Sequence, residues 1–313
     1  MTVSRVLSGY RGVRPETRAR VEEAVVALGY RVHTAARTLA GGRSRTLGVI
    51  SVETPYYGPS NTLFGIEAAA RAAGHFVSFS MLRHVDESEM QASLEHLRSA
   101  HVDGAVVITP VRAAVDALCA VEPAMPLVVM CGDDVPGIPT VAIDQRHGAR
   151  LATRHLLELD HPTVHHVGAP ENWIDGKGRA TGWREELRDH GINPPAPLAG
   201  DWTPQSGYEA GRRLADDPDV SAVFAANDQM ALGILLALAE TGRPVPDDVS
   251  VVGFDDTPES AYFHPPLTTL RQDFAEAGRR CVDVLLDVIA GKTVDDHVAL
   301  PPRLVVRRST TRR

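Results

Sequence analysis

Carboxylate and amide side chains stand at the ends of several apolar runs in this chain. These positions are Asp144, Asn227, Asp228, Asp255 and Asp256. Carboxylates accept hydrogen bonds from hydroxyls, and amides both accept and donate them. Ligands of open α/β sheets bind at the carboxyl ends of strands, so these residues are candidates for contacts with a small polar molecule. The alternative is that they cap the helices that follow, because Asp and Asn are preferred N-caps.

The apolar runs are short and β-branched, and amphipathic stretches of helical length separate them. Strands are predicted at 46–52, 75–82, 104–109, 127–131, 140–144, 164–169, 221–227 and 249–256. Helices are predicted at 61–74, 88–100, 148–159 and 227–242. This alternation indicates βα units and parallel sheets. Because about ten strands are many for one sheet, the sequence predicts an α/β fold of two doubly wound parallel-sheet subdomains, with a clamshell cleft between them.

The composition excludes several classes of protein. The chain has 313 residues, of which 43% are hydrophobic, enough for two or three domains with real cores. It lacks an uncharged apolar stretch of about 18 residues, so no membrane span is expected. The arginine-rich N-terminus does not resemble a secretory signal. The cysteines Cys119, Cys131 and Cys281 are too far apart for a disulfide framework or a zinc site, so we expect a cytoplasmic protein without metal or cofactor.

The charge is distributed unevenly along the chain. Residues 1–46 contain nine arginines and three glutamates, although the whole chain carries a formal net charge of −8. The remainder is therefore strongly acidic. A basic terminal segment joined to an acidic body is typical of a nucleic-acid-binding arm, although exposed basic helices without that function are also common.

The first 28 residues predict two short helices. Pro15 opens a helix that extends to Leu28, with Val21 and Val25 on the same face as Leu28 and Gly29 as its stop. The preceding segment, TVSRVLSG, predicts a shorter helix ending at Gly9. Two such helices with a basic bias could form half of a helix-turn-helix domain that lacks the helix before them.

Longer motifs carry a family resemblance. TVSRVLSG and VRPETRARVEEAVVALGYRVHTAARTLAGGRSRTLGVI resemble, in order and spacing, the recognition helix, third helix and hinge of the lactose repressor family. Further matches to this family are GDWTPQSG (200–207), AANDQMALG (225–233), SVVGFDDT (250–257) and PPLTTLRQDF (265–274). The resemblance covers essentially the whole chain.

The resemblance implies a domain organisation. It places a partial helix-turn-helix domain at 1–32, and a hinge helix with its linker at 33–45. An N-terminal subdomain would comprise 46–143 with 273–300, and a C-terminal subdomain 144–272 with 301–309. In the family a first helix of about fifteen residues precedes the recognition helix. That helix is missing from this sequence, so we expect a DNA-binding domain that is impaired as written.

The resemblance also implies the residues that contact DNA. Thr2, Ser4 and Arg5 would lie on the recognition helix and face the major groove or its phosphates, where arginine can bind guanine in bidentate fashion. Leu39 would lie on the hinge helix and insert into the minor groove, which bends the duplex. Thr2 and Ser4 could instead contact only phosphate.

Seven ligand-contacting residues are implied by the same resemblance: Tyr56, Arg179, Trp202, Asn227, Asp255, Gln272 and Phe274. A guanidinium fork such as that of Arg179 can donate to two vicinal sugar hydroxyls. The indole face of Trp202 can stack on the apolar side of a pyranose. Asp255 would accept hydrogen bonds from hydroxyls and pair with Arg179. The alternatives are a surface salt bridge for Arg179, a core position for Trp202 and a helix cap for Asn227.

The first subdomain departs from the family pattern at the predicted pocket. Thr109 stands where an amide is expected, and Ile143 where an aromatic ring is expected. Cys131 replaces a carboxylate after the fourth strand, and Asp133 and Asp134 lie close enough in sequence to substitute for it. The C-terminal half therefore favours a galactose-like ring, whereas the N-terminal half leaves the aglycone and the epimer open.

The resemblance predicts a sugar-responsive, DNA-binding transcriptional regulator and repressor, whose operator affinity is changed by a galactoside-like inducer. We expect a homodimer on pseudo-palindromic operator DNA, because a tetramerising C-terminal helix known in the family has no counterpart here. Alternatives are a regulator that responds to another sugar or a purine, and a transporter's sugar-binding protein. The latter would need a signal peptide and no basic arm. Trp202 and Arg179 argue against a purine, whose site would use stacked aromatics and different donors.

An enzyme is not predicted, and no catalytic residue is assigned. Asp255 and Asp133 could be imagined as an acid/base pair. We expect Arg179, however, to keep the Asp255 carboxylate ionised by lowering its pKa, which suits a general acid poorly.

Overall fold

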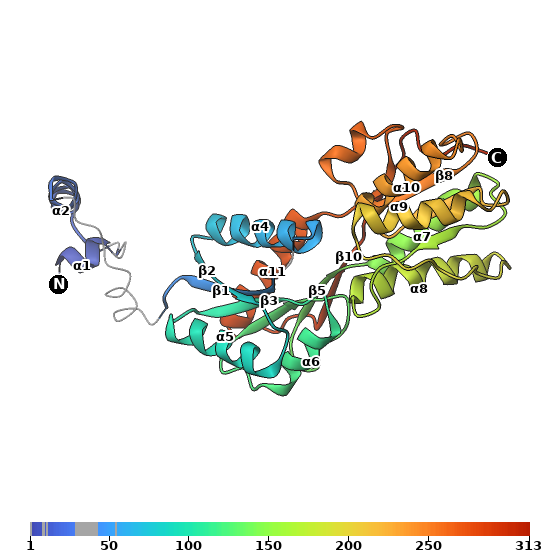
Figure 1. Cartoon of the computed structure of the whole chain (residues 1–313). Coiled ribbons are helices and arrows are strands. Elements are labelled where there is room, and N and C mark those ends of the chain that lie inside the picture. Colours follow the sequence, from blue (N-terminus) through green and yellow to red (C-terminus); the bar gives the residue numbers. More distant parts are fainter. Residues whose placement is uncertain (1, 8–9, 11, 29–42, 54) are drawn as a thin grey trace. The chain divides into compact units, whose positions relative to one another are not determined.

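The computed structural model describes residues 2–7, 10, 12–28, 43–53 and 55–313 (Figure 1). Leu39 and the predicted hinge helix at 33–42 lie outside the described residues. The chain divides into two compact units, Met1–Arg45 and Thr46–Arg313. No helix in the described ranges is both long and apolar enough to cross a membrane.

The first unit contains two helices, α1 (Thr2–Leu7) and α2 (Pro15–Ala27). Helix α2 begins at Pro15 as predicted, because the fixed φ of proline suits the first helical position and its missing N–H costs no hydrogen bond there. Val6 of α1 is buried, whereas no described residue of α2 is. The predicted apolar face of α2 therefore lines an open groove with Val3.

The second unit begins with a six-stranded parallel sheet in the order β10-β5-β4-β3-β1-β2. Its strands are β1 (Thr46–Val52), β2 (Phe76–Leu82), β3 (Gly104–Ile108), β4 (Leu127–Met130), β5 (Thr140–Ile143) and β10 (His297–Leu300). Helices α4 (Tyr57–Ala72) and α11 (Phe274–Ile289) cover one face, and α5 (Glu87–Ser99) and α6 (Arg112–Ala120) cover the other (Figure 1). We call this layered body the first lobe.

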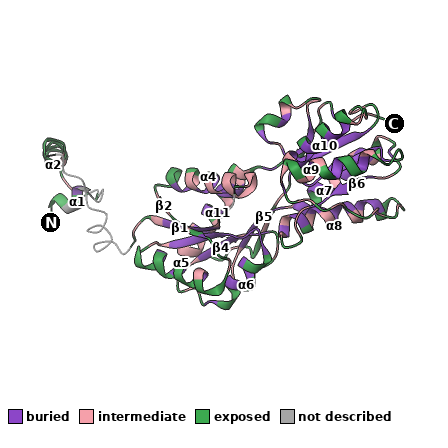
Figure 2. Cartoon of the chain, viewed as in Figure 1, coloured by how far each residue is buried: buried purple, intermediate pink, exposed green. Residues whose placement is uncertain are grey.

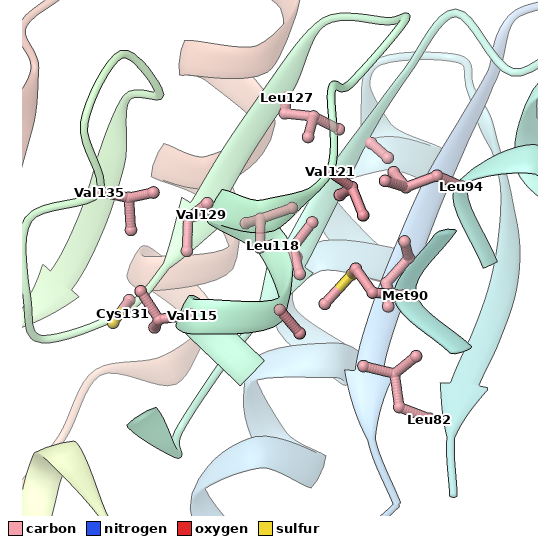
Figure 3. Packing of buried hydrophobic residues seen from close by; sticks show 14 of the residues in the cluster. Leu82, Met90, Leu94, Val115, Leu118, Val121, Leu127, Val129, Cys131 and Val135 are labelled. Carbon is pink, nitrogen blue, oxygen red and sulfur yellow. The ribbon is translucent and has the colours of Figure 1, made fainter. Parts of the chain in front are cut away.

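Two cores form on the faces of this sheet because successive side chains of a strand point to opposite sides. Along β1, Leu47 and Val49 pack against the side of α4 and α11, and Ile50 packs against the side of α5 and α6. Figure 3 shows the second of these cores, in which Met90 of α5 and Leu118 of α6 lie over the sheet.

A five-stranded sheet follows in the order β11-β9-β8-β7-β6, parallel except for β11. Its strands are β6 (His165–Val167), β7 (Ala222–Ala225), β8 (Ser250–Asp255), β9 (Thr268–Arg271) and β11 (Arg303–Val305). Helices α9 (Pro204–Ala215) and α10 (Asp228–Glu240) pack on one face, and α7 (Gln145–Glu158) and α8 (Ile174–Asp189) on the other. A short 3-10 helix, η1 (Pro258–Tyr262), follows β8. We call this body the second lobe.

The chain passes between the lobes three times, after β5, after β9 and after β10. Each lobe has a buried sheet between helices whose outer faces are exposed (Figure 2). The predicted α/β fold with two doubly wound sheets is therefore confirmed. Strands β5 and β9 end where the chain makes its first two passages between the lobes, and β8 lies beside β9. The polar residues at the ends of these three strands therefore lie at the cleft.

Candidate functional site

A cavity of about 60 Å³ lies between the two lobes. All seven residues predicted to contact a ligand line it: Tyr56, Arg179, Trp202, Asn227, Asp255, Gln272 and Phe274. The structure thus brings together residues that are spread over 219 positions of sequence. Because the strands of both sheets end at this gap, their loops and following helices converge on it.

Four side chains form a closed ring at the polar end of this cavity. Arg179 Nε donates to Gln145 Oε1 at 2.9 Å, and Gln145 Nε2 donates to Gln272 Oε1 at 2.9 Å. Gln272 Nε2 donates to Asp255 Oδ1 at 2.6 Å, and that oxygen lies 3.5 Å from Arg179 Nη2. Gln145 and Gln272 belong to the first two passages between the lobes. The ring therefore connects the ion pair to both passages.

Arg179 is buried, so the alternative of a surface salt bridge is wrong. Its guanidinium lies 3.9 Å from the centroid of the Phe254 ring and 5.3 Å from that of Trp202, and it also donates to the Ala226 carbonyl. Burial lowers the pKa of Arg179 from its ordinary value, and the nearby carboxylates, Asp255 foremost, oppose this shift. Two aromatic faces and fixed acceptors hold its fork in one orientation.

Asp255 does not titrate as the sequence predicted. Burial raises the pKa of Asp255 to about 6, and Arg179 and Gln272 offset only part of this rise. Arg179 lowers this pKa as expected, but the expected net result is wrong, because desolvation of a buried carboxylate outweighs a partner at 3.5 Å. Neighbouring Asp228 accepts from Thr257 N and Ser260 Oγ, and burial together with Asp255 raises the pKa of Asp228 to about 7.

Three aromatic side chains form the opposite end of the cavity. The Tyr56 and Trp173 centroids are 5.2 Å apart at 79°, and those of Trp173 and Trp202 are 5.5 Å apart at 69°. Trp202 has a φ of 74°, which is rare for a residue with a side chain, and its indole N–H is buried without a hydrogen-bond partner in the described part of the chain. Trp202 also packs in the second-lobe core. It is therefore both a core residue, as the alternative interpretation stated, and part of the cavity wall.

Trp173 was missed by the sequence analysis. It is half-buried and stands directly before α8 as its N-cap residue. Its neighbours Glu171 and Asn172 are polar, and a large aromatic residue in a polar loop is the signal that could have identified it. Sequence pattern alone did not indicate that this loop faces the cleft.

Asn227 caps a helix, which was the alternative interpretation of this residue in the sequence. Its Oδ1 accepts from Met230 N at 2.9 Å at the start of α10, and its Nδ2 donates to the Trp202 carbonyl at 3.1 Å. Asp144 similarly caps α7 by accepting from His147 N at 2.8 Å. Asn227 therefore holds the backbone of Trp202 in place, and its amide retains one further hydrogen for another acceptor.

The first-lobe wall differs from the prediction in its acidic residues. Asp133 pairs with Arg112, and Asp134 lies 3.3 Å from His297. Neither aspartate lines the cavity, so the idea that they replace a carboxylate at Cys131 is wrong. The additional carboxylate comes instead from Asp175 of α8, where burial raises its pKa. Its spacing of four from Arg179 puts both side chains on one helix face, a signal the sequence analysis did not use.

Phe274 is positioned by a close helix contact. It begins α11, and its ring meets the edge of Tyr57 with centroids 5.7 Å apart. A Cβ atom on Gly65 of α4 would lie 2.3 Å from the Phe274 carbonyl oxygen, so only glycine permits this approach. The contact fixes Phe274 and Tyr57 together at the cavity wall.

Direct contacts join the two lobes at the edge of the cleft. Tyr56 Oη donates to the Asp201 carbonyl at 3.3 Å, Ile174 N to the Pro110 carbonyl at 2.9 Å, and Arg112 N to the Asn172 carbonyl at 3.1 Å. An engineered cavity of about 150 Å³ accepts benzene, so a cavity of about 60 Å³ is too small for a six-membered ring. A sugar ring is therefore accommodated only if these contacts separate and the cavity widens.

Two of the four residues predicted to contact DNA can be placed with their side chains. Thr2 and Arg5 are exposed on α1, and the Arg5 guanidinium lies 5.5 Å from the Tyr10 ring centroid. Ser4 belongs to the same helix. An exposed arginine on a short helix can reach phosphate or a base edge.

Two family models match the chain. The model described as bacterial regulatory proteins, lacI family, matches residues 1–33, and a periplasmic binding protein-like domain matches residues 153–310. The first is the lactose repressor family that the sequence motifs indicated.

Relatives match over nearly the whole chain. The lactose operon repressor of Escherichia coli (strain K12) is 34% identical, over 99% of this chain and 86% of that protein. The transcriptional regulator CelR of Thermobifida fusca is 34% identical, over 98% and 94%. The transcriptional repressor PurR of Haemophilus influenzae is 31% identical, over 98% and 94%. These relatives are regulators and not enzymes, which agrees with the sequence prediction.

Solved structures show the same architecture. A Lac repressor dimer bound to operator and the anti-inducer ONPF superposes with a TM-score of 0.88 at 32% identity, covering 99% of this chain and 94% of that one. A complex of the regulator CelR with cellobiose gives a TM-score of 0.75 at 30% identity, covering 98% and 94%.

Proposed function

The chain belongs to the lacI family of bacterial regulatory proteins, and on that basis we propose that it is a transcriptional repressor whose affinity for operator DNA changes when a galactoside-like sugar binds in the cleft. The seven predicted ligand contacts and the DNA contacts of Thr2, Ser4, Arg5 and Leu39 are parts of this proposal. So are the boundaries: DNA-binding segment 1–32, hinge 33–45, subdomains 46–143 with 273–300 and 144–272 with 301–309.

The ring of Arg179, Gln145, Gln272 and Asp255 is the observation that carries the proposal. A sugar ring offers adjacent hydroxyls that donate and accept at once, together with an apolar face of C–H groups. The cavity offers a guanidinium fork, three side-chain amides and two carboxylates beside an indole whose N–H lacks a partner among the described residues. This combination suits a polyol, since each buried polar group could exchange its present bond for one to a hydroxyl.

We propose that the protein acts as a homodimer. Large apolar side chains are exposed on α4 and β2 of the first lobe and on α10 of the second: Phe64, Phe76, Phe79, Met81, Leu232 and Leu236. Strand β2 is also an edge of its sheet. Exposed apolar surface of this extent is typical of an interface between subunits. A two-fold dimer would present two DNA-binding segments to the halves of a pseudo-palindromic operator.

The proposed mechanism is linkage between the cleft and the DNA-binding segment. A ligand that contacts both lobes favours one relative orientation of them and changes operator affinity by its differential affinity for the two states. By reciprocity, operator changes the affinity for the ligand by the same factor. Gln145 and Gln272 suit this role because they contact both the ion pair and the passages between the lobes.

Calorimetric titration tests the proposed effector. The purified chain is titrated with lactose, galactose and an alkyl thiogalactoside, and in parallel with glucose, maltose and hypoxanthine. We expect saturable binding of the galactosides only. Binding of glucose or maltose in preference to galactosides would contradict the galactoside assignment and favour another sugar.

A purine is the second candidate, because the relatives at 31% identity include the repressor PurR. The arrangement of Tyr56, Trp173 and Trp202 disfavours a purine. These three rings meet at 55–79°, and no pair among them is parallel, as stacking on both faces of a flat base would require. Saturable binding of hypoxanthine in the same titrations would reverse this choice.

A further inference from the structure

The cavity has two chemically different ends that one residue connects. The polar end holds Arg179 and its hydrogen-bonded ring, and the aromatic end holds Tyr56 and Trp173. Trp202 touches both, since its ring lies 5.3 Å from the Arg179 guanidinium and its centroid 5.5 Å from that of Trp173. A single sugar ring on the polar end would occupy Trp202 and leave Trp173 beyond its edge.

The backbone of Trp173 is held on both sides. Trp173 N donates to the Pro170 carbonyl at 3.0 Å, and the Trp173 carbonyl accepts from Lys177 N at 3.0 Å, so both bonds lie within the second lobe and persist when the lobes separate. A ring on such a backbone loses little conformational entropy when it meets a ligand, which is why preorganised aromatic groups contribute strongly to affinity.

Tyr56 and Trp173 come from opposite lobes. Tyr56 precedes α4 of the first lobe, and Trp173 precedes α8 of the second. Both are half-buried, whereas Arg179 and Asp255 are buried, so the two rings belong to the more exposed part of the cavity lining. A group bound against both rings would contact both lobes at the edge of the cleft.

We propose that the effector is a glycoside with a second ring, and that Trp173 is the residue that selects for this ring. The first ring would lie at the polar end against Trp202, and the second against Trp173 and Tyr56. This inference rests on the proposed function, because it assumes that a sugar occupies the polar end. The second ring is either another sugar or an aryl group, since both present a face that stacks on indole.

Matched glycosides test the inference by calorimetry. The chain is titrated with methyl and phenyl β-galactoside, methyl and phenyl β-glucoside, and lactose. Aromatic pairs contribute about 0.5–1.5 kcal/mol beyond their buried area, so we expect the phenyl compound to bind roughly tenfold more tightly than its methyl partner. Tighter binding of lactose than of methyl galactoside would identify a sugar as the second ring.

Two variants of Trp173 test whether its ring causes the preference for phenyl glycosides, and a core variant controls for effects on folding. In Trp173→Leu we expect the phenyl-to-methyl affinity ratio to fall to about one while methyl glycoside affinity stays unchanged, and in Trp173→Phe most of the ratio should remain. Trp183→Phe is the control, because Trp183 is buried in the second-lobe core and does not line the cavity.

The outcomes distinguish this inference from the proposed function. Equal binding of methyl and phenyl glycosides by the unaltered chain, or a ratio that survives Trp173→Leu, would overturn the inference and leave the sugar site standing. Binding of glucosides rather than galactosides, with the phenyl preference intact, would overturn only the galactoside assignment. If none of these sugars binds, both fail.

Discussion

The two walls of the cleft differ in chemistry although both line the same cavity. Among the described residues that line it, every charged one comes from the second lobe: Asp175, Arg179 and Asp255. The first lobe contributes apolar and weakly polar groups, including Thr109, Met130, Cys131 and Ile143. The difference indicates that the second lobe recognises hydroxyls, whereas the first lobe closes over the ligand and shapes its less polar side.

This asymmetry has an energetic reason. Buried charges cost several kcal/mol of desolvation unless partners compensate them, so a charged wall must keep its partners together. The second lobe and the two passages provide them in one hydrogen-bonded ring around Arg179 and Asp255. The first-lobe wall carries no such requirement, so its side chains can vary without leaving a charge unpaired.

Replacing Arg179 should have the largest effect. Arg179→Met leaves Asp255 buried without its cation, which costs about 3–5 kcal/mol of folding stability, and removes the proposed hydroxyl donor. Urea unfolding and galactoside titration measure the two losses. Arg146→Met is the matched control, because Arg146 forms an exposed pair with Glu185 and should lose less than about 1 kcal/mol. If both variants lost the same free energy of unfolding, the buried ion pair would be no more important for stability than the exposed one, which would contradict this explanation.

Asp255→Asn should change how stability depends on pH. The folded pKa of Asp255, about 6, is raised above its ordinary value of 3.8. Its contribution to stability is therefore fully present below the unfolded pKa and is lost as the pH rises through about 6. Relative to Asp255→Asn, the unaltered protein should lose on the order of 2–3 kcal/mol between pH 4 and pH 8.

Asp201→Asn provides the control of opposite sign for this pH dependence. Hydrogen bonds from Thr203 and Ser206 lower the pKa of Asp201, so its stabilisation is lost as the pH falls rather than as it rises. Urea midpoints measured from pH 8 down to below pH 3.8 cover both variants, because the stabilisation by Asp201 is lost only below the ordinary pKa of 3.8. Parallel pH profiles for the unaltered protein and Asp255→Asn would contradict the raised pKa of Asp255.

Trp202→Leu should weaken ligand binding by about 1–2 kcal/mol, or roughly tenfold, because the stacking face at the centre of the cavity is lost. Trp183→Phe should leave ligand affinity unchanged while it lowers stability, since the Trp183 indole donates to the Val164 carbonyl in the core. Titration calorimetry with the two variants separates these effects. Unaltered affinity in Trp202→Leu would remove the indole from the proposed site.

The smallest effect is expected on the first-lobe wall. Cys131→Ser keeps the size of this buried side chain and its capacity to accept from Asp133 N. We expect ligand affinity to change by less than ~1 kcal/mol, about fivefold. A larger loss, measured in the same titrations, would mean that the first lobe takes part in recognising hydroxyls, and the contrast between the walls would fail.

The sequence predicted the strands β1 to β8, long and short alike, and missed β9, β10 and β11. The runs at 46–52 and 249–256 became β1 and β8 because their apolar residues could only be buried in a sheet. Strand β9 was not predicted, since Thr268 and Thr269 are polar. They are buried nonetheless, because the Thr268 hydroxyl accepts from Arg307 N and the Thr269 hydroxyl donates to Asp228, both from other parts of the chain. Such compensation depends on tertiary contacts that a local pattern does not contain.

The candidate site was predictable in its composition but not in its electrostatics. Family motifs placed Arg179 and Asp255 together, and the structure brings them to 3.5 Å. The direction of the Asp255 pKa shift depends on how far burial exceeds pairing, which sequence does not specify. Gln145 and Trp173 were missed for a related reason: their roles depend on which side of a loop or helix start faces the cleft.

Operator binding with and without sugar tests the central claim most directly. A DNA duplex selected by the purified chain from a random pool is titrated at fixed salt, in the absence and presence of a saturating galactoside, and the sugar is titrated with and without that DNA. We expect sugar and operator to change each other's affinity by the same factor, and Arg179→Met to abolish this coupling. Operator binding that is identical with and without a bound sugar would contradict it.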